Sequence, residues 1–201
     1  MRYYHLAEQN GWAPPEVQYR MGSAYYHLEE WKNALEYFFL ASADLPLNRR
    51  LLFALGNAAY QRNDYSLSQG YYSRLLDILE AERSRLPMLL PNDRPDYLEL
   101  AERLMMARNN AGVVHEALAE QTGDQRYRTR AMALYAESSR AWDSLTRNPD
   151  TMIRSGSRPL PQLNIRNTLY PQSSYEPQIF PSIDKDVLEP SSWEHLIEPR
   201  F

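Results

Sequence analysis

A fixed spacing of small and large residues recurs along the N-terminal half of this chain. The segment from Pro15 to Pro46 reads PEVQYRMGSAYYHLEEWKNALEYFFLASADLP, with Gly22 and Ala34 set among large apolar residues. Gly22 has a counterpart 34 residues later, Gly56. Because glycine in a helix interior costs about 1 kcal/mol relative to alanine, its recurrence needs a packing reason. The spacing predicts antiparallel helix pairs whose axes approach closely at the small residues.

The two copies agree at several positions when the second is placed 34 residues after the first. The first copy has characteristic residues at Met21, Gly22, Tyr25, Trp31, Ala34, Phe38, Ala41 and Pro46. The second has them at Leu52, Leu55, Gly56, Tyr65 and Tyr72, and departs from the pattern at Ala59, Ser68, Leu75 and Glu80. The unit resembles the tetratricopeptide repeat, a helix–turn–helix motif with a 34-residue period. This resemblance implies an all-α fold, a right-handed solenoid of antiparallel helix pairs.

A third copy and a half-copy complete the predicted repeat domain, residues 1–147. Gly112, Ala131 and Tyr135 match the pattern with seven extra residues, about two helical turns, which keep the apolar stripe on one face. We therefore place repeats at about 15–48, 49–82 and 94–147. Tyr4 and Ala7 match the second helix of a repeat, giving a half-repeat over 3–12. That half-repeat indicates either the C-terminal piece of a longer protein or a simple capping helix.

The C-terminal segment, residues 148–201, has a different composition. It holds eight of the fourteen prolines, yet it is also rich in large apolar residues. Since proline fixes φ and biases its predecessor toward extended geometry, we expect an extended, Pro-rich tail that packs on the repeats or on another protein. A capping box that begins at Ser191 predicts one short terminal helix. The expected tail contacts are Tyr170, Tyr175, Phe180, Trp193 and Phe201.

Composition and motifs argue against several function classes. The chain has no cysteine, a net charge of −4 and a pI near 5.6, which gives no electrostatic case for nucleic-acid binding. It has no apolar run long enough for direct membrane insertion. None of the four histidines has a metal-ligand spacing, and no phosphate loop or nucleophile motif occurs. We therefore expect a protein that is not an enzyme and that has no metal or cofactor.

A binding surface follows from the family resemblance, because the first helices of successive tetratricopeptide repeats line a concave groove. Tyrosine offers rigid apolar area, and asparagine amides can pair with a peptide backbone. The clamp that some family members use for a terminal carboxylate is not expected, since Tyr19 and Phe53 stand at its lysine positions. Ordinary packing or capping remains the alternative role for each residue. The expected groove residues are Tyr19, Arg20, Ser23, Tyr26, His27, Arg50, Phe53, Asn57, Tyr60, Gln61, Asn109, Asn110 and Val113.

These features favour a non-catalytic protein–protein interaction scaffold that binds a protein or peptide through the groove and the tail. Two alternatives stay open: a self-inhibited regulatory module whose tail occupies its own groove, or an accessory domain of a larger enzyme. A cysteine-free C-terminal repeat block is also similar to the scaffold proteins of the spirochaete periplasmic flagellar collar. That similarity implies a role in bacterial flagellar assembly, with a periplasmic location favoured over a cytoplasmic one. Both a homo-oligomer and a hetero-oligomer are compatible with these patterns.

Overall fold

The computed structural model describes residues 11, 14–85, 95–147, 160–169 and 177–180, and the regular structure in these ranges is entirely helical. The all-α prediction is therefore confirmed for this part of the chain. The predicted half-repeat over 3–12, apart from Gly11, and the predicted terminal helix that begins at Ser191 lie outside the described residues. The described helices are α2 (Pro15–His27), α3 (Trp31–Asp44), α4 (Arg49–Gln61), α5 (Tyr65–Arg85), α6 (Pro95–Thr122), α7 (Gln125–Leu145) and α8 (Leu160–Leu169).

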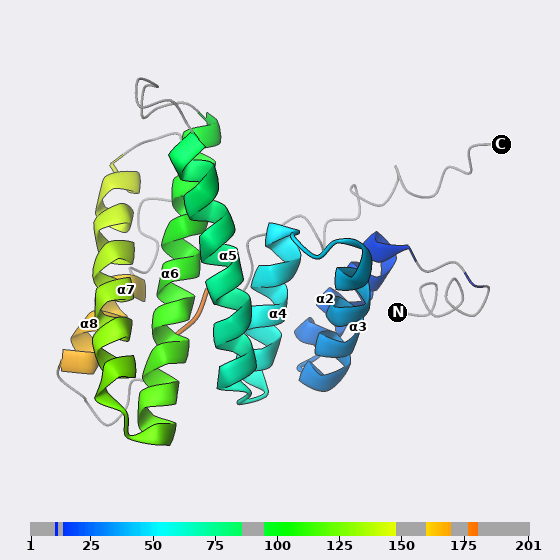
Figure 1. Cartoon of the computed structure of the whole chain (residues 1–201), viewed down its shortest axis with the longest axis horizontal. Helices are drawn as coiled ribbons and strands as arrows, with labels where there is room; N and C mark the ends of the chain where they lie inside the picture. Colours follow the sequence, from blue (N-terminus) through cyan, green and yellow to red (C-terminus); the bar gives the residue numbers. More distant parts are fainter. Residues whose placement is uncertain (1–10, 12–13, 86–94, 148–159, 170–176, 181–201) are drawn as a thin grey trace.

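Each helix packs mainly against its neighbours in chain order. Figure 1 shows the pairs α2/α3, α4/α5 and α6/α7 side by side in a row, with α8 against α7 at one end. The pairs also touch each other, through α3 with α4 and through α5 with α6. The core thus runs along the row, from the first helix pair to the last.

The turns inside the three pairs are short because one residue in each takes a left-handed conformation. These residues are Glu29 (φ 59°), Asn63 (φ 60°) and Gly123 (φ 73°). A left-handed residue after a helix lets the next amides bond back to the last turn, as Asp64 N does to Ala59 O at 2.9 Å. The chain can therefore reverse within a few residues, and the two helices of each pair lie antiparallel.

The three predicted contact glycines are buried, each against one aromatic ring of the following helix. The spacing from glycine to ring is 16 residues in the first two pairs and 23 in the third, which is the same spacing plus the seven extra residues. The prediction that these glycines mark close helix contacts is confirmed. A Cβ atom would lie 2.5 Å from the Phe38 ring at Gly22, 2.8 Å from the Tyr72 ring at Gly56 and 2.6 Å from the Tyr135 ring at Gly112.

Ion pairs add cross-links between the last three long helices. The Arg108 side chain on α6 is only 12% exposed, and its Nε lies 3.1 Å from Glu137 Oε2 on α7. The same guanidinium also pairs with Glu80 on α5. Because the arginine is nearly buried and both carboxylates reach it, this group joins three helices rather than two.

The tail departs from the extended form expected for residues 148–201, because α8 is a regular helix within it. Its prolines do not prevent this. Pro159 precedes the helix and Pro161 lies in its first turn, where the missing N–H has no intrahelical partner to lose. Within the tail, only residues 177–180 are described without regular secondary structure. The expectation of an extended tail was therefore wrong for 160–169.

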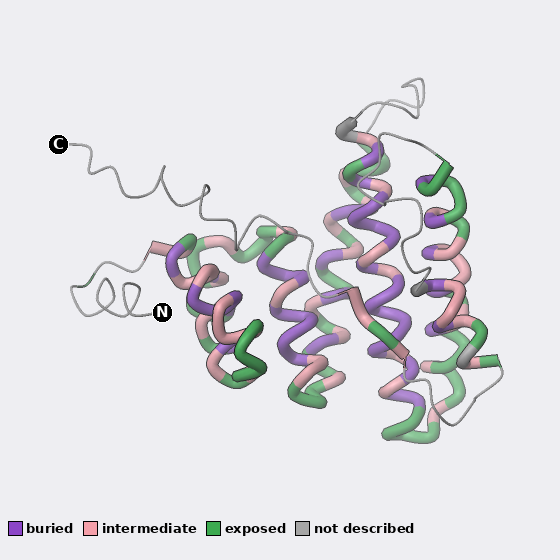
Figure 2. The backbone as a smooth tube through the Cα atoms, turned by 180° about the vertical axis from the view of Figure 1, so that it is seen from behind, coloured by how far each residue is buried: buried purple, intermediate pink, exposed green. Residues whose placement is uncertain are grey.

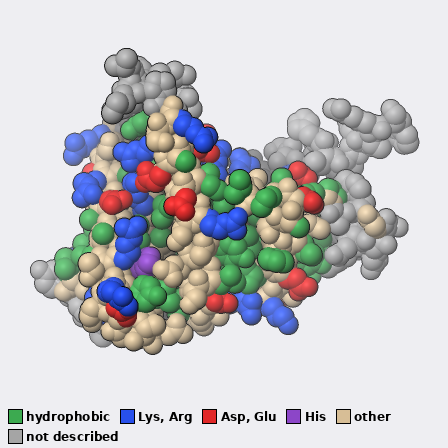
Figure 3. Space-filling model, viewed as in Figure 1, with side chains coloured by type: hydrophobic (Ala, Val, Ile, Leu, Met, Phe, Trp, Pro, Cys, Tyr) green, Lys and Arg blue, Asp and Glu red, His purple; other side chains and the backbone are tan. Residues whose placement is uncertain are grey.

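The surface is mixed in character. On the face drawn in Figure 3, hydrophobic side chains gather toward α3 and α4, while charged side chains are interspersed over α5 to α7. The most exposed large apolar residues of these helices and their turns include Phe39 and Leu47, at 64% and 65%. Among the described helices, none combines the length and the apolar character needed to cross a membrane.

Candidate peptide-binding site

Four buried asparagine side chains converge on the backbone of residues 177–180. Asn57 comes from α4, Asn109 and Asn110 from α6, and Asn164 from α8; each is at most 1% exposed. We call these four residues the asparagine cluster. In Figure 2, which shows the side opposite to that in Figure 1, the 177–180 segment runs obliquely across the row of helices. Residues far apart in the chain thus meet at one place.

The cluster binds both polar backbone groups of two alternate residues. The Gln178 N–H donates to Asn164 Oδ1 at 3.1 Å, and its carbonyl accepts from Asn164 Nδ2 at 3.0 Å and Asn109 Nδ2 at 3.1 Å. The Phe180 N–H donates to Asn110 Oδ1 at 2.7 Å, and its carbonyl accepts from Asn110 Nδ2 at 3.0 Å and Asn57 Nδ2 at 3.1 Å. Asn164 and Asn110 therefore each bind one residue through both amide atoms.

This geometry suits an extended peptide. In extended backbone the N–H and C=O of one residue point the same way, and those of the next residue point the opposite way. A primary amide offers an acceptor oxygen and a donor nitrogen at matching spacing. The cluster therefore reproduces, with side chains, the hydrogen bonds that a neighbouring β-strand would make.

The repeat packing itself positions the part of the cluster that binds Phe180. The Tyr72 ring packs on Gly56, and its hydroxyl donates to Asn57 Oδ1 and accepts from Asn110 Nδ2 at 3.0 Å. Asn110 Nδ2 also lies 3.0 Å from Asn57 Oδ1. Burial raises the pKa of Tyr72 well above its ordinary 10.0, because its effect is larger than the lowering of the pKa by the hydrogen bond with Asn110. The hydroxyl thus stays a proton donor that orients both amides.

A parallel arrangement in the third pair holds α8 in place. The Tyr135 ring packs on Gly112, and its hydroxyl donates to Glu116 Oε2 at 2.9 Å. Glu116 Oε1 accepts from Thr168 Oγ1 of α8 at 2.9 Å. Burial raises the pKa of Glu116, while the Tyr135 and Thr168 bonds lower it. In the first pair the matching ring is Phe38, which has no hydroxyl to offer.

Three of the thirteen groove residues expected from the sequence form the cluster: Asn57, Asn109 and Asn110. Two more lie close by, since Val113 belongs to the buried group on which Ile179 packs, and Tyr60 packs on the same group. Phe53 is instead a core residue, 1% exposed and edge-on to the Tyr72 ring at 5.8 Å.

The other expected groove residues lie outside the cluster. Tyr19 and Tyr26 pack on Phe38 and Trp31, with ring centroids 5.5 and 4.8 Å apart. Ser23 donates to the carbonyl of Tyr19 at 3.0 Å within α2. The remaining four are half-buried or exposed on α2 and α4: Arg20, His27, Arg50 and Gln61.

Sequence reasoning missed Asn164, because the tail was expected to be extended. A usable signal was present: two prolines at a helix start, followed by Asn164 and Thr168 four residues apart, which places both on one helix face. Of the expected tail contacts, Phe180 is described and is bound as above. Tyr170, Tyr175, Trp193 and Phe201 lie outside the described residues.

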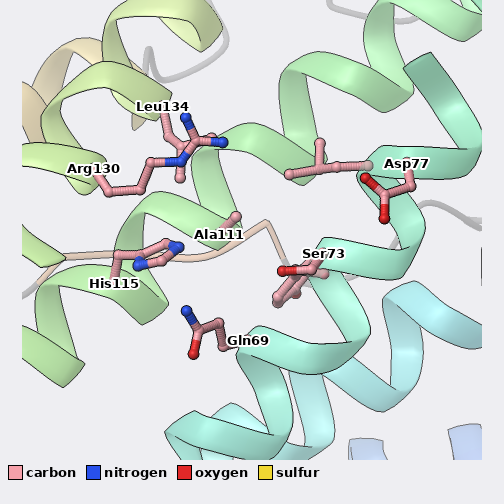
Figure 4. Close-up of a pocket in the computed structure, with 9 residues that line it drawn as sticks. Gln69, Ser73, Asp77, Ala111, His115, Arg130 and Leu134 are labelled. Atoms are coloured by element: carbon pink, nitrogen blue, oxygen red, sulfur yellow. The ribbon is translucent and has the colours of Figure 1, made fainter.

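A separate polar pocket of about 290 Å³ opens between α5, α6 and α7. Figure 4 shows its lining side chains, with Gln69, Ser73 and Asp77 on α5 and His115 and Arg130 opposite them. Among the described residues, His115 Nδ1 is buried without a hydrogen-bond partner. No group of three metal-ligating side chains occurs in the described ranges. We assign no reaction to this pocket.

His115 gives a testable pH dependence. Burial, helped by the charge of Arg130, lowers its pKa from 6.5 to about 4. The unfolded chain therefore binds a proton between these values that the folded chain does not. We expect the free energy of unfolding to fall as the pH drops from about 6.5 to about 4. Urea unfolding across this range should show a smaller fall for His115→Gln than for the wild type. An equal fall in the free energy of unfolding for the two proteins would contradict the lowered pKa of His115.

Comparison with known proteins adds no family to these observations. No protein-family model matches the chain, and no curated protein matches its sequence. The tetratricopeptide-like interpretation and the similarity to flagellar-collar scaffolds therefore remain predictions from the sequence.

Proposed function

We propose that this chain is a non-catalytic interaction module, built from tetratricopeptide-like helix pairs, that binds an extended segment of a partner protein. The asparagine cluster carries this proposal. It supplies donors and acceptors for the backbone of two alternate peptide residues, and it draws them from α4, α6 and α8. The cluster would coincide with the concave groove expected from the sequence.

The burial of the cluster favours a binding role. With residues 177–180 in place the four side chains are buried, and a buried amide that finds no partner costs about 1–3 kcal/mol. Any occupant of this place must therefore bring matching polar groups. Here the occupant is a backbone, whose donors and acceptors are the same in every peptide. A partner segment could therefore replace residues 177–180 without any change in the asparagines.

One observation favours a second candidate, a self-occupied regulator. The segment in the cluster belongs to the same chain and is separated from the end of α8 by seven residues. A partner would then have to displace residues 177–180. Its apparent affinity would be its intrinsic affinity multiplied by the fraction of molecules in which the cluster is free. The scaffold and the regulator thus differ in whether residues 177–180 compete with the partner for the cluster or leave it open.

A labelled peptide separates the two candidates. The probe is SYEPQIFPSI, the sequence of residues 174–183, titrated by fluorescence anisotropy into three full-length proteins. These are the wild type, Ile179→Asp/Phe180→Asp, which vacates the cluster, and the same double variant with Asn110→Ala. We expect saturable binding to the vacated chain and at least tenfold weaker binding when Asn110 is also replaced.

The wild-type titration then decides between the candidates. A regulator binds the probe at least tenfold more weakly as wild type than as the vacated variant, whereas a scaffold with an open site binds it equally well in both. No saturable binding to a folded vacated variant, judged by circular dichroism, would overturn the proposal. Equal binding with and without Asn110 would also overturn it.

A further inference from the structure

The hydrogen bonds in the cluster cannot select one peptide over another. The hydrogen bonds that Asn164 and Asn110 make with the segment go to backbone atoms of Gln178 and Phe180. Any non-proline residues in extended conformation would satisfy them. If the site is selective, its selectivity must come from the side chains of the bound segment, and these differ sharply in their surroundings.

Two adjacent side chains of the segment enter two different apolar clusters. Ile179 packs on the group formed by Val113, Ala131 and Tyr135. Phe180 packs on the group that contains Trp142 and also borders the group that contains Tyr72. Its ring stacks on that of Trp142, with centroids 6.3 Å apart and 26° between the ring planes. Gln178, in contrast, is exposed. The segment therefore presents one solvent-facing residue followed by two anchors.

Helix α7 explains why the anchors must be adjacent and different. Tyr135 and Trp142 are seven residues apart, two turns on one face of α7, which separates them by about 10 Å along the axis. Consecutive side chains of an extended chain point in opposite directions, so neighbours can reach two sites that are this far apart. The site toward Trp142 borders an aromatic ring, which suits another ring through offset stacking.

Proline after the second anchor favours the bound conformation. Pro181 follows Phe180 in the sequence, and a residue before proline is biased toward extended geometry. Phe180 must be extended for its N–H and C=O to face Asn110 together. Less conformational freedom is then lost on binding.

We infer that the asparagine cluster and the two apolar groups beside it select extended peptides in which a branched aliphatic residue is followed directly by an aromatic residue and then proline. The side chain of the residue before the aliphatic residue does not affect selection. This inference rests on the proposed function, because it names the class of partner segment that the same site would take. The partner is thus a protein with an exposed Ile-Phe-Pro-type segment, and residues 177–180 are its internal copy.

Variants of the probe peptide test the selectivity. The vacated full-length chain, Ile179→Asp/Phe180→Asp, is titrated with SYEPQIFPSI and with peptides that carry alanine for the isoleucine, the phenylalanine or the glutamine. We expect at least tenfold weaker binding for each of the first two and less than a twofold change for the third. Alanine for the proline after phenylalanine should weaken binding by a smaller factor, about threefold.

The outcomes separate this inference from the proposal beneath it. If the parent peptide binds and the isoleucine and phenylalanine variants bind equally well, the site reads backbone alone and the inference is overturned, while the proposed function stands. If the parent peptide does not bind a folded vacated chain, both are overturned.

Should the vacated chain not fold, the single changes Ile179→Ala, Phe180→Ala and Gln178→Ala in the full chain replace it, with amide exchange over residues 174–183 as the readout. Faster exchange is then expected only for the first two, and equal exchange in all three would overturn the inference.

Discussion

Replacing Gly112 with alanine should lower the free energy of unfolding by about 2–3 kcal/mol. The new Cβ would lie 2.6 Å from the Tyr135 ring, and that ring is fully buried with its hydroxyl bonded to Glu116. The ring therefore cannot move aside without breaking the bond that helps to hold α8. Urea unfolding followed by far-UV circular dichroism measures the change.

A second glycine offers a matched control. Gly70 lies in α5, is exposed, and would place a new methyl group in open space, with no neighbouring atom within 4 Å. Gly70→Ala should therefore stabilise the protein by up to about 1 kcal/mol through helix propensity alone. If Gly112→Ala and Gly70→Ala shift stability in the same direction, the close contact between helices is not what requires glycine at position 112.

Replacing Asn110 with alanine should lower the free energy of unfolding by about 2–4 kcal/mol. This side chain contacts Phe180 through both amide atoms and also bonds to Asn57 and Tyr72. Its loss removes the acceptor of the Phe180 N–H, at about 1–3 kcal/mol for a buried group that water cannot reach. It also removes bonds to the Phe180 carbonyl and to Asn57 and Tyr72, which keep other partners. The same urea unfolding measurement applies.

Two variants with smaller expected losses of stability serve as comparisons for Asn110→Ala. Tyr72→Phe removes only the hydroxyl that bonds to Asn57 and Asn110, so we expect a loss of about 1 kcal/mol. Asn33→Ala removes an amide that bonds to Glu30 at the protein surface, and should change stability by less than about 0.5 kcal/mol. An Asn110→Ala effect as small as that of Asn33→Ala would show that the cluster does not hold the segment.

The helix pairs were predictable from the sequence because their packing is local in the repeat. Gly22, Gly56 and Gly112 each meet a ring at a fixed distance along the chain, so the spacing alone indicates the contact. The lengthened third pair followed the same rule, since seven residues make about two turns.

The site was only partly predictable, for physical reasons. Asn57, Asn109 and Asn110 were expected on one surface because the repeat register places them there. The occupant was not predictable, because the cluster contacts the backbone of Gln178 and Phe180, and backbone groups leave no signature in the sequence. Asn164 was missed together with α8, where proline suggested extended chain although its position favoured a helix start.

Amide hydrogen exchange at Gln178 and Phe180, followed by NMR in the full-length protein, tests the asparagine cluster most directly. Both N–H groups donate to buried asparagine oxygens, at 3.1 and 2.7 Å. We expect their exchange to be at least a hundredfold slower than in the free peptide SYEPQIFPSI, and Asn110→Ala to accelerate it at Phe180. Exchange of both amides at the rate of the free peptide would contradict the bound segment, and with it the binding role proposed for the cluster.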